Sequence, residues 1–229
     1  MYIWAKYSLE SKQNVAEREV FREKLETYLK AGQVAPELLQ VWFWDETGFS
    51  LRVLRRKCWT RKGCRRKVSG LRSRGRVNVM GGLRYHDKKC LCYFVDKGNA
   101  DSFFEQLEHL NKFVRQEWVE QGNLAELYER IGPRVLVILD NASYHKRQDI
   151  IDKIEQTLPN IQLCSLPAYS PDFNLIELVW YACKEFIAHR LFQSVHQLEE
   201  LLKRLLNDGE LVINWSKKIR NKGNKVIAN

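Results

Sequence analysis

An unbroken apolar run near the middle of the chain restricts its fold most strongly. Residues Val135 to Leu139 read VLVIL, which are all apolar and mostly β-branched. A strand of this kind is buried on both faces, as in a mixed or parallel sheet with helices on each side. The run ends in Asp140 and Asn141, at the strand end where open α/β sheets usually bind ligands. The alternative is that these two residues only end the strand and begin a turn.

A second acidic pair follows another short apolar segment. Residues 39–43 (LQVWF) are expected to form a short strand that runs into Asp45 and Glu46. Because side chains alternate along a strand, the two acids would face opposite sides, and at most one readily shares a site with Asp140. We choose Asp45 for that site and keep Glu46 as a supporting residue.

Hydrophobic periodicity and capping signals predict the other elements. A helix over 14–31 begins at its cap Asn14 and stops at Gly32, and a long helix begins at Asn99 or Asp101. Gly81 and Gly82 indicate a bulge or a close backbone approach. The remaining predictions are strands over 77–85, 89–95 and 161–166, and helices over 148–158, 175–191 and 194–206. Together they predict an α/β fold with a mixed central sheet flanked by helices.

A strongly basic segment separates the first two predicted strands. Residues 52–76 carry twelve positive charges and no acid, and the whole chain has a formal net charge of +10. This pattern favours a phosphate-binding loop or hairpin and does not imply sequence-specific reading of bases. Trp59 within it is expected to anchor the loop rather than stack on a base. The residues assigned to DNA binding are Arg55, Arg56, Lys57, Arg61, Lys62, Arg65, Arg66, Lys67, Arg72, Arg74 and Arg76.

Other sequence features indicate the cellular compartment and argue against a membrane-spanning protein, a secreted protein and a paired-cysteine zinc site. No apolar run approaches the ~20 residues of a membrane helix, and the N-terminus lacks a secretory pattern. We therefore expect a cytoplasmic protein without membrane contact, associated with the nucleoid when bound to DNA. The six cysteines are expected to be reduced, and their spacing matches no paired CxxC zinc site.

A third acid, Glu177, completes a candidate metal site with Asp45 and Asp140. Alone, Glu177 fits a capping box with Asn174 three residues earlier. Taken together, three carboxylates suit Mg²⁺ or Mn²⁺, and phosphodiester cleavage suits two such ions about 4 Å apart. Adjacent strand ends and a helix edge can supply this geometry.

Three segments carry a resemblance to a known family. WDETGF (44–49), ILDNASYH (138–145) and LPAYSPDFNLIELVW (166–180) resemble the catalytic domain of DDE transposases, in the bacterial insertion-sequence branch of the mariner superfamily. The resemblance extends from Trp42 to about Leu206. It implies a ribonuclease-H-like fold with a catalytic, metal-binding triad of Asp45, Asp140 and Glu177.

The resemblance also implies an activity. Metal-activated water cuts the transposon ends, and the freed 3′ hydroxyl attacks target DNA, with two Mg²⁺ or Mn²⁺ ions as cofactors. By analogy, Asp45 bridges both ions while Asp140 and Glu177 hold one each. Asn141 and His145 belong to the family motif as supporting residues, and we expect His145 to be a structural hydrogen-bonding group. The implied partners are transposon ends and target DNA, with a homodimer on DNA.

Two departures from the family pattern affect these expectations. Leu175 stands where the family usually has proline. A leucine at this position should leave the helix intact. About 40 residues precede the first catalytic strand, where the family usually has about a hundred that include a helix-turn-helix DNA reader. We therefore expect a lead-in arm at 1–40 from the end of a missing reader or linker, a catalytic domain at 41–208 and a basic tail at 209–229. The alternatives are a DNA-binding remnant without activity and another ribonuclease-H-like nuclease.

Overall fold

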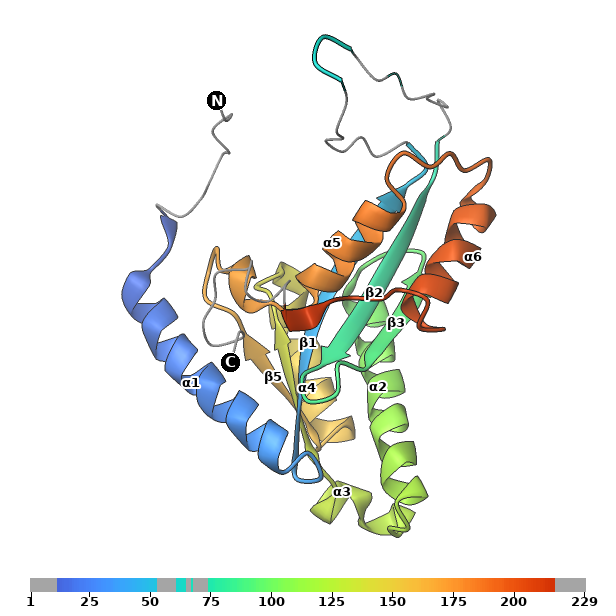
Figure 1. Cartoon of the computed structure of the whole chain (residues 1–229). Coiled ribbons are helices and arrows are strands. Elements are labelled where there is room, and N and C mark those ends of the chain that lie inside the picture. Colours follow the sequence, from blue (N-terminus) through green and yellow to red (C-terminus); the bar gives the residue numbers. More distant parts are fainter. Residues whose placement is uncertain (1–11, 53–60, 65–66, 68–73, 217–229) are drawn as a thin grey trace.

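The computed structural model describes residues 12–52, 61–64, 67 and 74–216 (Figure 1). Within these ranges, five strands form one sheet in the order β3-β2-β1-β4-β5. The central β1 pairs antiparallel with β2 and parallel with β4, so the predicted mixed sheet is confirmed. The strands are β1 (Leu39–Ser50), β2 (Arg76–Arg84), β3 (Cys90–Val95), β4 (Arg134–Leu139) and β5 (Ile161–Ser165).

Helices cover both faces of the sheet and create two apolar cores (Figure 1). On one face lie α1 (Val15–Val34), α5 (Glu177–Phe186) and α6 (Val195–Leu206), and on the other lie α2 (Ala100–Glu120), α3 (Tyr128–Ile131) and α4 (Gln148–Thr157). Strand β4 sends Leu136 and Ile138 into the first core and Val135, Val137 and Leu139 into the second. The central run is therefore buried on both faces, as predicted. Short 3-10 turns are η2 (Ala125–Leu127), η3 (Ser143–Lys146) and η4 (Pro171–Phe173).

The strand that carries Asp45 is longer than the sequence indicates. We predicted a strand over 39–43, but β1 spans 12 residues. Its parallel pairing with β4 ends at Phe43, whereas its antiparallel pairing with β2 continues to Ser50. Asp45 and Glu46 therefore lie inside the strand rather than after it. The ladder with β2 supplies the hydrogen bonds for this polar half, which apolar periodicity does not signal.

Two glycine predictions are settled by close packing. Gly32 does not stop the first helix, because α1 continues to Val34. A Cβ at Gly32 would lie 3.1 Å from the carbonyl oxygen of Leu39, so this glycine lets α1 approach β1. Gly81 pairs regularly with Asp45, and a Cβ there would lie 2.8 Å from the Leu91 carbonyl oxygen. Close backbone approach, not a bulge, explains Gly81.

The first two long helices begin at predicted cap residues, whereas the helix predicted from residue 175 begins later. Asn14 caps α1, and Asn99 rather than Asp101 caps α2 in a capping box with Ser102. The helix predicted over 175–191 is shorter and begins at Glu177. Cys90, Cys92, Cys164 and Cys183 form no disulfide among the described residues, and Cys58 lies outside them. Of the helices in the described ranges, none combines the length and apolarity needed to cross a bilayer.

Candidate active site

The structure brings the three predicted acids to one cavity. The parallel ladder ends with Phe43 of β1 paired to Ile138 of β4, and Asp45 and Asp140 follow two residues further along these two segments. Glu177 is the first residue of α5. Asp45, Asp140 and Glu177 line a cavity of about 500 Å³, together with Asn141 and Asn174. Two adjacent strands and a helix start thus supply the three carboxylates.

Asn174 does not cap α5. The helix begins without a side-chain capping bond, so the capping-box interpretation of Asn174 and Glu177 is wrong. The buried Asn174 amide instead donates a 2.9 Å hydrogen bond to the carbonyl oxygen of Trp44. This bond attaches the segment before α5 to β1, one residue before Asp45. Asn174 therefore makes a contact with a residue 130 positions away in the chain instead of the local capping box that the sequence suggested.

Trp180 is a site residue that sequence analysis missed. Its indole Nε1 donates a 3.0 Å hydrogen bond to Oδ2 of Asp45, and its ring is buried. A Cβ at Gly81, the strand partner of Asp45, would lie 3.3 Å from the Trp180 ring. The available signal was the spacing of three from Glu177, which places both residues on one side of α5.

Burial and neighbouring charges shift the pKa values of Asp45 and Asp140 in opposite directions. Burial, and then the charges of Glu177 and Asp140, raises the pKa of Asp45 to about 7. The hydrogen bond from His145 holds the pKa of Asp140 below its usual value. Without a cation, Asp45 therefore holds a proton far more readily than Asp140 does.

The residues after β4 form a tight turn that begins at Asp140. The backbone N–H of Ala142 donates 2.9 Å to Oδ1 of Asp140, so the predicted turn exists alongside the cavity. Asn141 donates from Nδ2 to the carbonyl oxygen of Leu166. His145 in η3 lies with Nδ1 3.1 Å from Oδ1 of Asp140 and contacts the site through that carboxylate.

Glu46 faces the opposite side of the sheet from Asp45, as alternation predicted. Its Oε1 lies 3.9 Å from Nε2 of His145, in the layer formed with α2. Burial raises the pKa of Glu46 above its ordinary value. Glu46 therefore lies behind His145 rather than in the cavity.

The donor set fits a divalent cation, although the acids do not form a ready-made cluster. Among the residues in the described ranges, no three His, Cys, Asp or Glu side chains converge closely enough to hold an ion as they stand. Asp45, Asp140 and Glu177 nevertheless offer hard carboxylate oxygens to one cavity. Burial, and then the charges of Glu177 and Asp140, raise the pKa of Asp45, and a cation bound among these carboxylates would oppose that effect.

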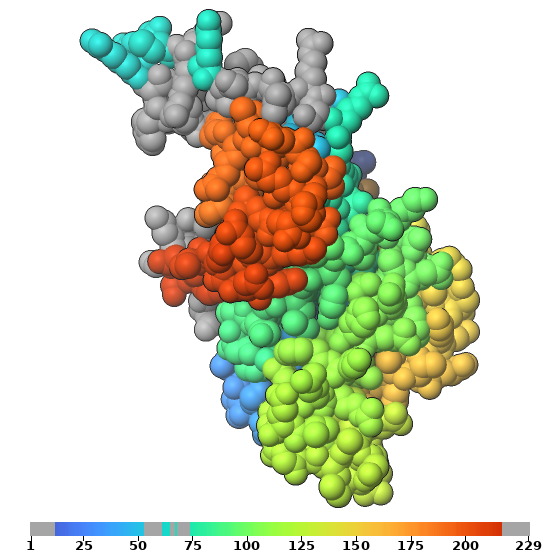
Figure 2. Space-filling model, turned by 90° about the vertical axis from the view of Figure 1, so that its right-hand side faces the viewer, coloured from blue at the N-terminus to red at the C-terminus, as the bar shows by residue number. Residues whose placement is uncertain are grey.

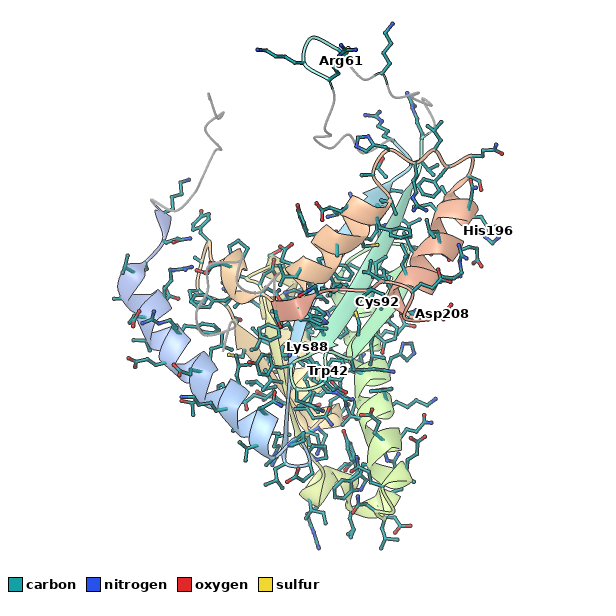
Figure 3. All side chains as sticks on the ribbon, viewed as in Figure 1. Trp42, Arg61, Lys88, Cys92, His196 and Asp208 are labelled. Atoms are coloured by element: carbon teal, nitrogen blue, oxygen red, sulfur yellow. The ribbon has the colours of Figure 1, made fainter. Side chains whose placement is uncertain are left out.

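The basic segment lies in the connection between β1 and β2, at the far end of the hairpin. The described residues Arg61, Lys62, Lys67, Arg74 and Arg76 are exposed. Figures 1 and 2 show residues 61–64 (cyan) beyond the body of the protein, and Figure 3 shows Arg61 far from the core residue Trp42. The other predicted DNA-binding residues, Arg55, Arg56, Lys57, Arg65, Arg66 and Arg72, lie outside the described residues, as do Trp59 and positions 217–229.

Comparison with known proteins identifies the family. The family of DDE superfamily endonucleases matches residues 40–199. No curated protein sequence matches this one. Among solved structures, the catalytic domain of Mos1 mariner transposase has a TM-score of 0.60 at 17% identity and covers 98% of this chain and 97% of that one.

Longer Mos1 chains show the same fold. The Mos1 mariner paired end complex with Mn has a TM-score of 0.66 at 17% identity, covering 100% of this chain and 66% of that one. The Mos1 Strand Transfer Complex has a TM-score of 0.64 at 16% identity, covering 99% of this chain and 63% of that one. This chain thus spans about two thirds of the chains in those complexes. It is an α/β protein with the predicted ribonuclease-H-like fold, and it belongs to the DDE superfamily endonucleases.

Proposed function

We propose that this chain is the catalytic part of a DNA transposase of the bacterial insertion-sequence branch. It would cut DNA at transposon ends with divalent metal and join the 3′ hydroxyl to target DNA. The observation that carries this proposal is the convergence of Asp45, Asp140 and Glu177 on one cavity in a DDE endonuclease. The likeness to Mos1 complexes named for paired ends, strand transfer, Mn and Mg supports it.

The three acids would divide the work of holding two Mg²⁺ or Mn²⁺ ions. Asp45 interacts electrostatically with both Glu177 and Asp140, so it suits the shared position, while each of the others would hold one ion. When bound, such ions activate the nucleophile and stabilise the leaving oxygen of the phosphodiester. Trp180 would orient Asp45, and Asn141 would lie beside the phosphate.

DNA would be the partner of the basic segment. The exposed Arg61, Lys62 and Lys67 carry charge without a neighbouring acid in the sequence, which suits backbone phosphates. We propose that a homodimer holds two ends, and that the protein acts on nucleoid DNA in the cytoplasm. We also propose that residues 41–208 are the catalytic domain, with a lead-in arm at 1–40 and a basic tail at 209–229.

Nicking of supercoiled plasmid with Mn²⁺ tests the proposal. Wild type and Asp149→Asn, an exposed acid in α4, should nick the plasmid, whereas Asp140→Asn should not. Equal nicking by Asp140→Asn would refute the role of the acids. A gel shift on the same DNA completes the test. Binding without cleavage by wild type would support either a catalytic part that needs its missing reader or a DNA-binding remnant, and absence of binding would argue against the role of the basic segment.

A further inference from the structure

The carboxylate of Asp140 is held by the protein through one of its two oxygens. Oδ1 lies 2.9 Å from the backbone nitrogen of Ala142 and 3.1 Å from Nδ1 of His145. Within the part of the chain that the structure describes, no hydrogen bond is recorded to Oδ2. Since Asp140 lines the cavity, this arrangement leaves Oδ2 as the oxygen available there.

The geometry defines which nitrogen of His145 carries the hydrogen. Nδ1 lies near Oδ1 of Asp140 and also 3.4 Å from the backbone carbonyl oxygen of the same residue. An ionised carboxylate and a carbonyl oxygen only accept, so Nδ1 donates. The 3-10 turn η3 returns His145 to this position through a 3.0 Å bond from its own N–H to the Ala142 carbonyl.

The imidazole ring is held from three elements. Its side chain is only 4% exposed, and its centroid lies 4.4 Å from that of Phe103 in α2 and 4.2 Å from that of Tyr144. Behind it, Oε1 of Glu46 in β1 lies 3.9 Å from Nε2. Gly98 makes room for this acid, because a Cβ there would lie 2.0 Å from Oε2 of Glu46.

This environment is energetically unfavourable for a histidine whose role is only to pack in the hydrophobic core. Nε2 of His145 and Oε1 of Glu46 are both buried, and neither has a hydrogen-bond partner within the described ranges. Buried polar atoms without partners cost free energy, so an apolar side chain would pack there at lower cost. The short polar contacts of Nδ1 both go to Asp140, through a hydrogen bond to its backbone carbonyl oxygen and a 3.1 Å contact with Oδ1, which indicates that His145 holds this residue in place.

We propose that His145 is a positioning residue whose Nδ1–H fixes Oδ1 of Asp140 and thereby presents Oδ2 to the bound cation, with Glu46 behind the ring. This inference rests on the proposed function, in which Asp140 is a metal ligand. Hydrogen bonds that orient a metal ligand typically contribute about 10- to 100-fold to metal affinity.

Calorimetric titration of Mn²⁺ into the full chain without DNA tests the inference. In His145→Asn the amide nitrogen falls near the place of Nδ1, whereas in His145→Gln it falls near Nε2. Both variants lose the ring, so they suffer similar packing losses. The Asn variant should keep Mn²⁺ affinity within about threefold of wild type, and the Gln variant should lose about tenfold or more. Equal affinities in both variants, whether high or low, would overturn the positioning role.

Asp140→Asn separates this inference from the proposed function. If wild type does not bind Mn²⁺, or Asp140→Asn binds it equally well, the assignment of Asp140 as a ligand fails. If Asp140→Asn loses binding while His145→Gln keeps wild-type affinity, only the role of His145 is overturned. Thermal unfolding verifies that each variant is folded, and His145→Met, which lacks a donor, replaces the Gln variant if that one does not fold.

Discussion

Trp180 and Asp45 lie 135 positions apart in the chain and are joined by a 3.0 Å hydrogen bond from the indole nitrogen to Oδ2. The bond connects α5 to the central strand at the candidate site. Because Glu177 precedes Trp180 by less than one helical turn, the position of Glu177 depends on this contact.

Trp180→Phe should weaken both the fold and the site. The variant keeps an aromatic ring but leaves the half-buried Asp45 without its side-chain donor, which should cost about 1–2 kcal/mol of unfolding free energy. Urea denaturation measures the loss, and nicking assays should show lower activity. Trp118→Phe is the matched control, because that indole donates to the Leu124 carbonyl at an exposed position. Equal losses in both variants would contradict a special role for Trp180.

Asp45 should make the metal-free protein less stable as pH rises. Its pKa is raised from 3.8 to about 7 in the folded state, so between these values the folded chain holds a proton that the unfolded chain has released. Stability from this group therefore decreases through that window. Asp45→Asn removes the effect and should be more stable than wild type near pH 8, by up to about 4 kcal/mol for a shift of this size, with little difference near pH 4. Urea denaturation in EDTA at both pH values measures this, and a pH-independent difference would argue against it.

Gly81→Ala should destabilise the protein more than Gly48→Ala. The new Cβ at position 81 would lie 2.8 Å from a backbone oxygen and 2.9 Å from Sγ of Cys92, in the buried ladder. At position 48 the obstructing atoms belong to the exposed side chain of Arg76, which can move. We expect a loss of about 2–3 kcal/mol for the first and below about 1 kcal/mol for the second. Thermal and urea unfolding compare them, and similar losses would refute the packing argument.

Arg18 connects α1 to the loop that lines the cavity. Its guanidinium makes two hydrogen bonds to Asp172, of 3.0 and 2.9 Å, and lies 4.7 Å from the centroid of the Phe173 ring. A double-mutant cycle with Arg18→Ala and Asp172→Ala should give a coupling of about 1 kcal/mol, because the pair is bidentate and partly buried. The exposed pair of Arg22 and Glu19 should couple by less than about 0.5 kcal/mol. A coupling for Arg18 and Asp172 no larger than that control would contradict the prediction.

Arg61 and Lys62 should contribute to DNA affinity without sequence preference. Replacing both with alanine should reduce the slope of log affinity against log salt concentration by about 1–2. Fluorescence anisotropy with two unrelated duplexes measures the effect, which should be the same for both. Lys30→Ala in α1 is the control, since that lysine pairs with Glu26. An unchanged slope in the double variant would exclude these residues from the DNA contact.

The sequence was informative where the structure depends on local pattern. The VLVIL run predicted β4 and its burial on both faces, because period and apolarity act within a few residues. Alternation correctly separated Asp45 from Glu46, since neighbouring side chains on a strand face opposite sides.

Contacts between distant segments were not predictable in the same way. The length of β1 depends on its ladder with β2, and Asn174 contacts Trp44 rather than its own helix. The Trp180 ring lies against Gly81 on the neighbouring strand, where a Cβ would be 3.3 Å from it. Each of these features requires knowledge of which elements are adjacent, and hydrophobic periodicity carries no such information.

The two-sided pairing of β1 limits how the gene can change in length. A single codon inserted between Leu39 and Asp45 would shift the register against β4 and exchange the faces of Asp45 and Glu46. Codons added or lost between Ser50 and Arg76, the last paired residues of β1 and β2, change only the length of the connection and leave the faces and register of both strands as they are. Length variation among descendants of this gene should therefore concentrate between β1 and β2, and the reach of the basic segment can evolve independently of the catalytic geometry.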